Sequence, residues 1–300
     1  MKSCPICQSD KSRPERVLNS IDLMKCGNCD FVYADIKDDY IEKMNSDNAD
    51  GASSAYEDQQ TFIDVLWFQR IVHKFTKVKG RGKVLDVGCG NGLLLKCFVE
   101  FGWDCYGVDL SPWSRKYSDL YGFNFIQGKL ENLRLEENSF DLIVSTSTLE
   151  HIAQPLLHVE EVARLLKPGG IGYFVGIPNY RSISIVLGLS RFYSNTPPGH
   201  VNYFTTKTAR TLSRFLKTPI QGVTVKTYGI PEMYEIYNLL TLAFHGKKDG
   251  VSKDTVSNGT LQRKQKKSMS NTMGKSIITI YYYLGRLFSL GDKLEITIVK

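Results

Sequence analysis

Hydrophobic positions along the chain follow two different spacings. Short apolar runs such as 83–87 are typical of buried strands, whereas 58–78 repeats apolar residues every three or four positions, as a helix does. Strands are predicted at 83–87, 105–108, 123–126, 140–145, 171–176, 221–228 and 294–299, and helices at 93–101, 113–121, 155–166 and 206–215. Because strand and helix alternate from residue 83, we expect an α/β fold whose mostly parallel sheet carries helices on both faces.

Composition divides the chain into four predicted parts. They are a cysteine-punctuated module at 1–35, a polar linker (36–57) and a helix within 36–80, an α/β domain at 81–229 with 293–300, and a helical insertion at 230–292. The net charge of +7 is mostly local, because residues 247–267 hold seven Lys or Arg against two Asp. We interpret this stretch as a solvated loop, with an RNA or anionic-membrane contact as the alternative.

The length of 300 residues suffices for one α/β domain and a small module without disulfides. No signal peptide and no apolar run of about 20 residues is visible. We therefore expect a cytoplasmic protein with reduced thiols.

A glycine-rich turn follows the strand at 83–87. Gly88, Gly90 and Gly92 open the next helix, and Asp109 ends the second strand, 17 residues after Gly92. Glycines let the backbone approach a ligand closely, the helix N-terminus offers N–H donors, and an acid at the second strand can accept ribose hydroxyls. Dinucleotides and S-adenosylmethionine both fit that arrangement.

The spacing Gly-x-Gly-x-Gly, with Asp86 two residues earlier, resembles motif I of the class I methyltransferases. Residues 106–111 resemble motif II, 125–133 the motif III region, and 165–170 the turn before the fifth strand. The resemblance implies a Rossmann-like, seven-stranded, mostly parallel sheet with a reversed last strand, and S-adenosylmethionine as the cofactor.

The same resemblance implies a set of cofactor-binding residues. Asp86 and Gly88 would face the methionine moiety, Asp109 the ribose, and Lys129 with Leu130 the adenine. Lys129 departs from the family, which often has Asp there, and a Lys side chain offers no acceptor. The other expected cofactor-binding residues are Cys89, Gly90, Gly92, Leu110, Ser145 and Arg70; Arg70 would pair with the methionine carboxylate.

Two Cys-x-x-Cys pairs, Cys4 with Cys7 and Cys26 with Cys29, are separated by 18 residues. This spacing predicts a structural zinc ribbon, in which four thiolates close the coordination sphere. A ribbon joined to this type of methyltransferase resembles bacterial sugar and cell-surface glycan methyltransferases, where it lies on the substrate side. Nucleic acid is not the favoured partner, because residues 1–35 carry no basic stripe.

Three residues at strand ends are candidates for catalysis: Glu150, His151 and His200. The segment Leu-Glu-His-Ile resembles quinone-precursor O-methyltransferases, whose acid-x-x-Glu-His loop can hold a divalent metal, although Ser147 replaces the first acid. Residues 199–205 resemble a Glu-His segment of sugar C-methyltransferases, with Gly199 in place of Glu, which favours an oxygen acceptor.

We therefore expect O-methylation of a sugar or glycan intermediate. The alternatives are a lipid, quinone-precursor or RNA methyltransferase, or a non-catalytic cofactor-binding module. Residues 180–196 are expected to roof the pocket for a small-molecule or glycan acceptor, and together with 276–290 they offer a possible peripheral contact with a membrane. The acceptor atom, a second metal at Glu150–His151 and the oligomeric state stay open.

Overall fold

The computed structural model describes residues 2–51, 62–182, 185, 196–228 and 289–300. Most of the expected roof at 180–196, the basic stretch, and all but the last residues of the predicted insertion at 230–292 lie outside this part of the chain.

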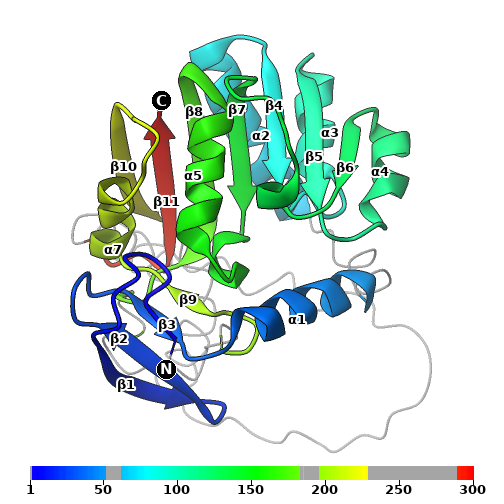
Figure 1. Ribbon diagram of the computed structural model, residues 1–300. Helices are drawn as coiled ribbons and strands as arrows, with labels where there is room; N and C mark the ends of the chain where they lie inside the picture. Colours follow the sequence, from blue (N-terminus) through cyan, green and yellow to red (C-terminus); the bar gives the residue numbers. More distant parts are fainter. Residues whose placement is uncertain (1, 52–61, 183–184, 186–195, 229–288) are drawn as a thin grey trace, which may run out of the picture.

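Seven strands form the central sheet (Figure 1). Their order is β10-β11-β8-β7-β4-β5-β6, and the four contacts among β8, β7, β4, β5 and β6 are parallel. The strands are β4 (Lys83–Val87), β5 (Asp104–Asp109), β6 (Asn124–Gln127), β7 (Phe140–Thr146), β8 (Leu166–Pro178), β10 (Gly222–Tyr228) and β11 (Lys293–Val299). Because β11 runs antiparallel to both β8 and β10, the predicted sheet with a reversed last strand is confirmed.

Alternate side chains of the sheet enter two separate cores. Leu85, Ile143 and Phe174 pack with α5 (Pro155–Leu165) and α7 (Thr206–Thr211), which is followed by a 3-10 turn at Leu212–Arg214. Their neighbours along the strands pack on the opposite face with α2 (Phe62–Lys79), α3 (Leu93–Glu100) and α4 (Ser114–Tyr121). Burial on both faces explains why these strands are apolar throughout.

The boundary between α5 and β8 differs from the prediction. We expected Pro168, Gly169 and Gly170 to separate helix and strand, but β8 already begins at Leu166 and includes them. The register breaks there, since Phe140 faces Leu166 whereas Leu142 faces Ile171. Gly169 has φ +73°, so the chain makes its turn as an irregularity within the strand.

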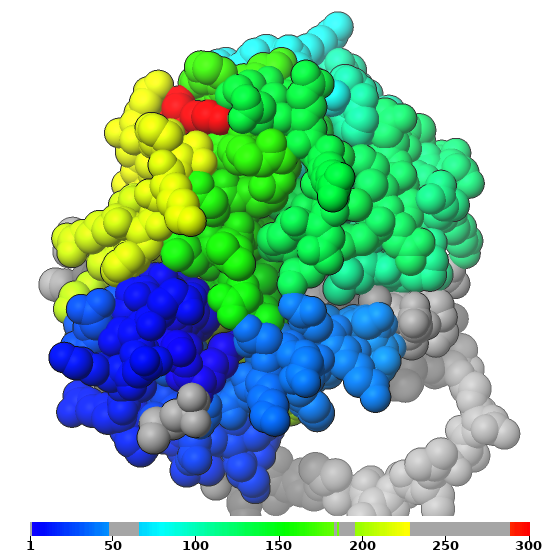
Figure 2. Space-filling model, in the orientation of Figure 1, coloured from blue at the N-terminus to red at the C-terminus, as the bar shows by residue number. Residues whose placement is uncertain are grey.

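The N-terminal module is a small sheet of β1 (Ser12–Leu18), β2 (Ile21–Cys26) and β3 (Val32–Ala34), which we call the ribbon. Its fourth strand, β9 (Asn202–Tyr203), comes from the distant part of the chain after β8. A strand from beyond the predicted boundary at residue 35 thus completes the ribbon sheet. In Figure 2 the N-terminal residues, in dark blue, lie directly against the green and yellow parts of the α/β domain.

Residues 36–57 were predicted to be a linker, and this is wrong for most of them. α1 (Asp38–Gly51) is a helix that lies beside the carboxyl ends of the strands (Figure 1). Its polar sequence lacks an apolar stripe, so the helix is held by individual contacts. Ile41 is fully buried against the ribbon, Lys2 pairs with Asp38, and Glu42 pairs with Lys129.

Among the described residues, no helix combines the length and the apolar character that a membrane span requires.

Candidate functional site

The glycine turn connects β4 to α3 and is fixed by the neighbouring strand. The amides of Gly88 and Cys89 both donate to the carbonyl of Val108. Gly88, Gly90 and Gly92 all have positive φ values, which suit glycine. A Cβ at Gly88 would lie 2.5 Å from Thr148 Oγ1, whereas one at Gly90 would meet nothing within 4 Å. The backbone at Gly90 is therefore open to a ligand.

Asp109 ties this turn to the end of β5. Its Oδ2 accepts the amide of Gly90 at 2.9 Å, and its Oδ1 accepts the amide of Ser111 at 2.9 Å. A carboxylate has about four lone-pair positions, so both oxygens keep acceptor capacity for further donors. Asp109 thus links the two loops and still offers oxygen atoms to the cavity that it lines.

A cavity of about 1250 Å³ lies at the carboxyl ends of β4, β5 and β7. Sites for one small molecule measure roughly 300–1,000 Å³, so the cavity has room for a cofactor together with an acceptor. Its walls are the glycine turn, the loops after β5 and β6, the loop after β7, and one face of α1. Of the predicted cofactor residues, those that line it are Asp86, Gly88, Cys89, Gly90, Asp109, Leu110, Lys129 and Leu130.

Three predicted cofactor residues are not in the cavity wall. Gly92 is the N-cap of α3, and Ser145 is a buried residue of β7. Arg70 is exposed on α2 and does not reach the lining. A role for these three in binding the cofactor stays a prediction.

Asp86, in the cavity wall, is almost completely buried, with 3% of its surface exposed. Its Oδ1 meets no hydrogen-bond partner within the part of the chain that the structure describes. Burial, with a smaller contribution from the charge of Asp109, raises the pKa of Asp86 to about 8. An unpartnered acid in a cavity wall fits a cationic donor, such as the ammonium group of a methionine moiety.

The structure reveals cavity residues that the sequence pattern did not indicate, because they lie on α1. Glu42 pairs with Lys129 at 2.5 Å, and Asn45 Nδ2 donates to the His151 carbonyl at 2.9 Å. α1 therefore closes the cavity from the side opposite the sheet. Glu42 also brings a carboxylate to Lys129, the position at which the family pattern often has an acid.

Glu150, His151 and His200 form a compact group, which we call the acid–histidine cluster. One possible ligand atom from each lies within 4.8 Å of the others. Glu150 and His151 belong to the 3-10 turn η2 (Leu149–His151) after β7, whereas His200 precedes β9. The two imidazole rings meet edge to face, with their centroids 4.5 Å apart. The predicted catalytic residues are thus brought together from two loops.

Only one member of this cluster, His151, belongs to the cavity lining among the described residues. Its Nδ1 lies 2.7 Å from the Gly199 carbonyl oxygen. Since a carbonyl accepts and cannot donate, Nδ1 carries the proton and Nε2 presents its lone pair. The geometry therefore makes His151 Nε2 a proton acceptor.

Burial shifts the pKa of each of the three groups in the direction that favours its neutral form. It raises the pKa of Glu150 to about 7 and lowers that of His151. It also lowers the pKa of His200 to about 3, with further contributions from His151 and Lys293. At neutral pH both imidazoles are uncharged, and Glu150 is close to its titration midpoint.

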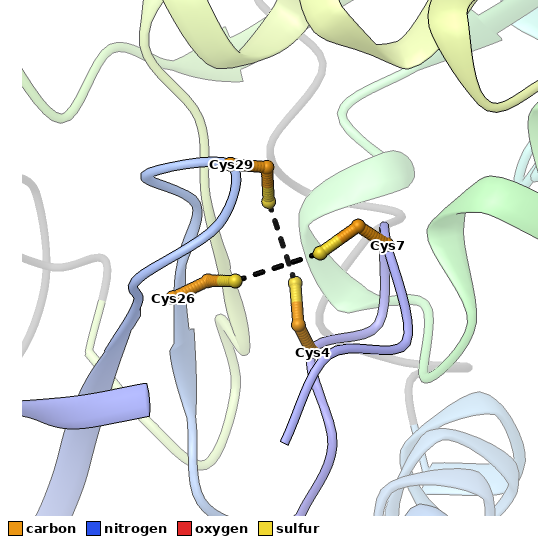
Figure 3. Close-up of side chains that lie close together, drawn as sticks. All are labelled: Cys4, Cys7, Cys26 and Cys29. Carbon is orange, nitrogen blue, oxygen red and sulfur yellow. Dashed lines mark hydrogen bonds between the residues drawn. The ribbon is translucent and has the colours of Figure 1, made fainter. Parts of the chain in front are cut away.

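The four predicted zinc ligands converge in the ribbon (Figure 3). Sγ of Cys4 lies 3.6 Å from Sγ of Cys29, and Sγ of Cys7 lies 3.5 Å from that of Cys26. Tetrahedral zinc with Zn–S bonds of about 2.3 Å requires sulfur atoms about 3.8 Å apart. The donor set and its spacing therefore fit zinc. We call these four residues the cysteine cluster.

Residues 85–174 match the family model described as a methyltransferase domain. They run from the third residue of β4 into β8 and include the glycine turn, Asp109 and the η2 turn. The chain contains a methyltransferase domain.

Curated relatives match about a third of this chain. A "Ubiquinone biosynthesis O-methyltransferase" of Xanthomonas oryzae pv. oryzae is 37% identical over 95 residues, covering 29% of this chain and 40% of the relative. The protein of the same name from Bordetella avium is 33% identical over 115 residues, covering 36% and 46%. The chain thus spans less than half the length of either relative.

Solved methyltransferases resemble the structure at low sequence identity. A SAM-dependent methyltransferase from Archaeoglobus fulgidus has a TM-score of 0.49 and 17% identity, covering 78% of this chain and 94% of its own. A SAM-dependent methyltransferase from Thermotoga maritima, described as a possible histamine N-methyltransferase, has a TM-score of 0.43 and 19% identity, covering 80% and 96%.

Proposed function

We propose that this protein transfers a methyl group from S-adenosylmethionine to a hydroxyl oxygen of a small molecule. The observation that carries the proposal is the large cavity, which has the glycine turn with Asp86 and Asp109 on one side and His151 on the other. A methyl donor and a proton acceptor in one cavity are what O-methylation needs.

The cofactor would lie along the glycine turn. Asp86 Oδ1 would accept the ammonium group of its methionine moiety, and Asp109 the ribose hydroxyls, while the backbone at Gly90 would allow close approach. When bound, S-adenosylmethionine supplies an electrophilic methyl group on a sulfonium centre. The chain's own residues then only have to orient the acceptor and remove its proton.

His151 would take the proton from the acceptor hydroxyl at Nε2. The Gly199 carbonyl, which already faces Nδ1, stabilises the imidazolium that results. Glu150, whose pKa of about 7 leaves it partly ionised at neutral pH, would balance that charge. His200 packs edge-on against the ring and would fix its orientation.

For the acceptor class, the names of the curated relatives favour the quinone-precursor alternative over the sugar or glycan intermediate that we expected. A phenolic hydroxyl also loses its proton more readily than a sugar hydroxyl, which suits a single neutral imidazole as the acceptor of that proton. We therefore propose a phenolic quinone precursor, represented in the test below by catechols, as the acceptor class. We also propose that the cysteine cluster holds a structural zinc ion.

Labelled methyl transfer to a catechol series and to a nucleotide-sugar series tests the acceptor, after calorimetry has measured S-adenosylmethionine affinity. We expect micromolar binding and labelled catechol ether. Labelled sugar with no labelled catechol ether would overturn the acceptor class. No cofactor binding would overturn the enzyme proposal and favour a non-catalytic module.

Replacement of His151 tests the proton acceptor. His151→Ala should lower kcat by about 10²- to 10⁴-fold and leave cofactor affinity unchanged, whereas His73→Ala, at an exposed position on α2, should change neither. Activity that requires added Mg²⁺ would overturn this role and assign the acid–histidine cluster to a metal instead.

A further inference from the structure

The ribbon reaches the acid–histidine cluster through a short strand. We propose that the cysteine cluster, when it holds its metal, positions Glu150, His151 and His200, and that Asn202 in β9 is the positioning residue. The activity readout below rests on the proposed function, whereas the spectroscopic readout does not.

The first step is the pairing of β9 with the ribbon. β9 has two residues and lies at the edge of the four-stranded ribbon sheet, with β3 as its neighbour there. Val32 faces Tyr203 and Tyr33 faces Asn202, and the amide of Ala34 donates to the Val201 carbonyl at 2.9 Å. A strand this short is not stable without its partner.

The second step joins β9 to the η2 turn that carries Glu150 and His151. The amide of Val201 donates to the Glu150 carbonyl at 2.9 Å. Asn202 Nδ2 donates to the Leu149 carbonyl at 3.0 Å and to the Ile152 carbonyl at 2.6 Å. One buried amide group thus holds both ends of the turn, and it can do so only while β9 keeps its place.

The same segment fixes both histidine rings. The Gly199 carbonyl accepts from His151 Nδ1, and His200 itself lies two residues before the start of β9. The Tyr203 hydroxyl donates to the His200 carbonyl at 3.0 Å. A displacement of residues 199–203 would therefore move His200 and release the hydrogen bond that sets the His151 tautomer.

The third step joins β9 and β3 to the metal ligands. Cys26 ends β2. Its amide donates a hydrogen bond to the carbonyl of Phe31, one residue before β3, and this bond fixes the position of Cys26 relative to β3. The Phe31 ring packs edge to face on Phe204, with centroids 4.9 Å apart, directly after β9. Cys4, Cys26 and Cys29 are also buried in the same core as these two rings.

Four thiols lie at the centre of the ribbon, and in a small module of this kind the bound metal contributes directly to folding. Loss of the metal would loosen the turn at 26–31, then β3, and then β9. The expected consequence is that Glu150, His151 and His200 lose their geometry while Asp86 and Asp109, held by β4 and β5, keep theirs.

The test uses full-length protein labelled with ¹⁵N in its histidine rings. Zinc removal by a chelator should shift or broaden the imidazole signals of His151 and His200. The signals of His73 on α2 and His158 on α5 should stay in place, and S-adenosylmethionine affinity by calorimetry should change less than about threefold. Unmoved His151 and His200 signals after complete zinc release would overturn the proposal.

Asn202→Ala provides the second test with the metal in place. We expect one zinc per chain, altered His151 and His200 signals, and a kcat lower by on the order of 10- to 100-fold. Lys207→Ala is the matched control, since the Lys207 side chain also joins the domain to the ribbon, but does so through an ion pair with Asp30. It should behave as wild type.

The two variants decide the outcome even if zinc removal unfolds the whole chain, which the His73 and His158 signals would report. Wild-type kcat and ring signals in Asn202→Ala would overturn the positioning role. Absence of methyl transfer by the unmodified protein would count against the proposed function only, because the ring signals still test the link between ribbon and site.

Discussion

Asp86→Asn tests the chemistry of the cofactor side most directly. Asp86 is buried without a hydrogen-bond partner among the described residues, and its pKa is raised from 3.8 to about 8. At pH 7 the carboxyl is protonated in the folded cofactor-free protein and ionised in the unfolded chain. About three pKa units separate the ordinary value from pH 7, so this difference costs the folded state about 4 kcal/mol.

Because the pKa of Asp86 is raised in the folded state, stability is lost as the pH rises. The cost to the folded state is absent below pH 4, grows by about 1.4 kcal/mol per pH unit, and levels off above pH 8. Asn does not titrate, so urea unfolding of the cofactor-free proteins should show Asp86→Asn gaining about 3 kcal/mol on wild type between pH 5 and pH 7. A difference that is independent of pH would refute this reasoning.

Asp141 provides a matched control, because its substitution should change stability with pH in the opposite direction. Asp141 is half-buried; burial alone would raise its pKa, but the hydrogen bonds from Lys167 Nζ and the Lys83 amide outweigh burial and lower it. Asp141→Asn should therefore destabilise the protein at neutral pH, and this loss should fade as the pH falls towards the lowered pKa.

Affinity for the cofactor should rise with pH, whereas the stability contribution of Asp86 in the cofactor-free protein falls. Only ionised Asp86 accepts the ammonium group as a charged partner, so wild-type affinity should rise about tenfold per pH unit up to pH 8. Asp86→Asn should bind about 10- to 100-fold more weakly at pH 8, the equivalent of one charge-assisted hydrogen bond. Its affinity should also lose the pH dependence, as calorimetry at several pH values would show.

Three further predictions concern the acid–histidine cluster and the glycine turn. Because Glu150 is ionised only above its raised pKa of about 7, wild-type kcat should rise through pH 7, and a pH–rate profile of Glu150→Gln should lack that limb. His200→Ala should lower turnover in the labelled-methyl assay by roughly 10- to 100-fold with unchanged cofactor affinity; unchanged turnover would remove His200 from the mechanism. Gly88→Ala should destabilise the fold by about 2–4 kcal/mol, since its Cβ would meet Thr148, whereas Gly90→Ala should cost about 1–2 kcal/mol and mainly weaken cofactor binding.

The sheet and the glycine-turn side of the cavity were predictable because their signals are local. A strand, a glycine turn and a helix are contiguous in the sequence, and Asp109 ends the neighbouring parallel strand. Once β4 and β5 pair, Asp86 and Asp109 must lie at the same edge of the sheet. Residues 150, 151 and 200 were likewise found as strand-end residues.

The parts that the sequence did not reveal depend on contacts between distant segments. α1 has no apolar stripe, so nothing in 36–57 distinguishes a helix held by Glu42, Asn45 and Ile41 from a linker. β9 is two residues long, too short for alternation to be visible, and its role comes from pairing with β3. Lys129 departs from the family pattern, and only the folded chain shows that Glu42 lies beside it.

Because β3 pairs with β9, the ribbon sheet cannot be completed until long after β3 has been synthesised. About 170 residues separate Val32 from Tyr203, and at roughly 5–20 residues per second their synthesis takes about 10–30 s. During that interval the four thiols have left the exit tunnel, but the strand that completes their sheet has not been made. Early zinc capture would protect these thiols from oxidation and hold a template ready for β9, so zinc supply during translation should influence the yield of folded protein.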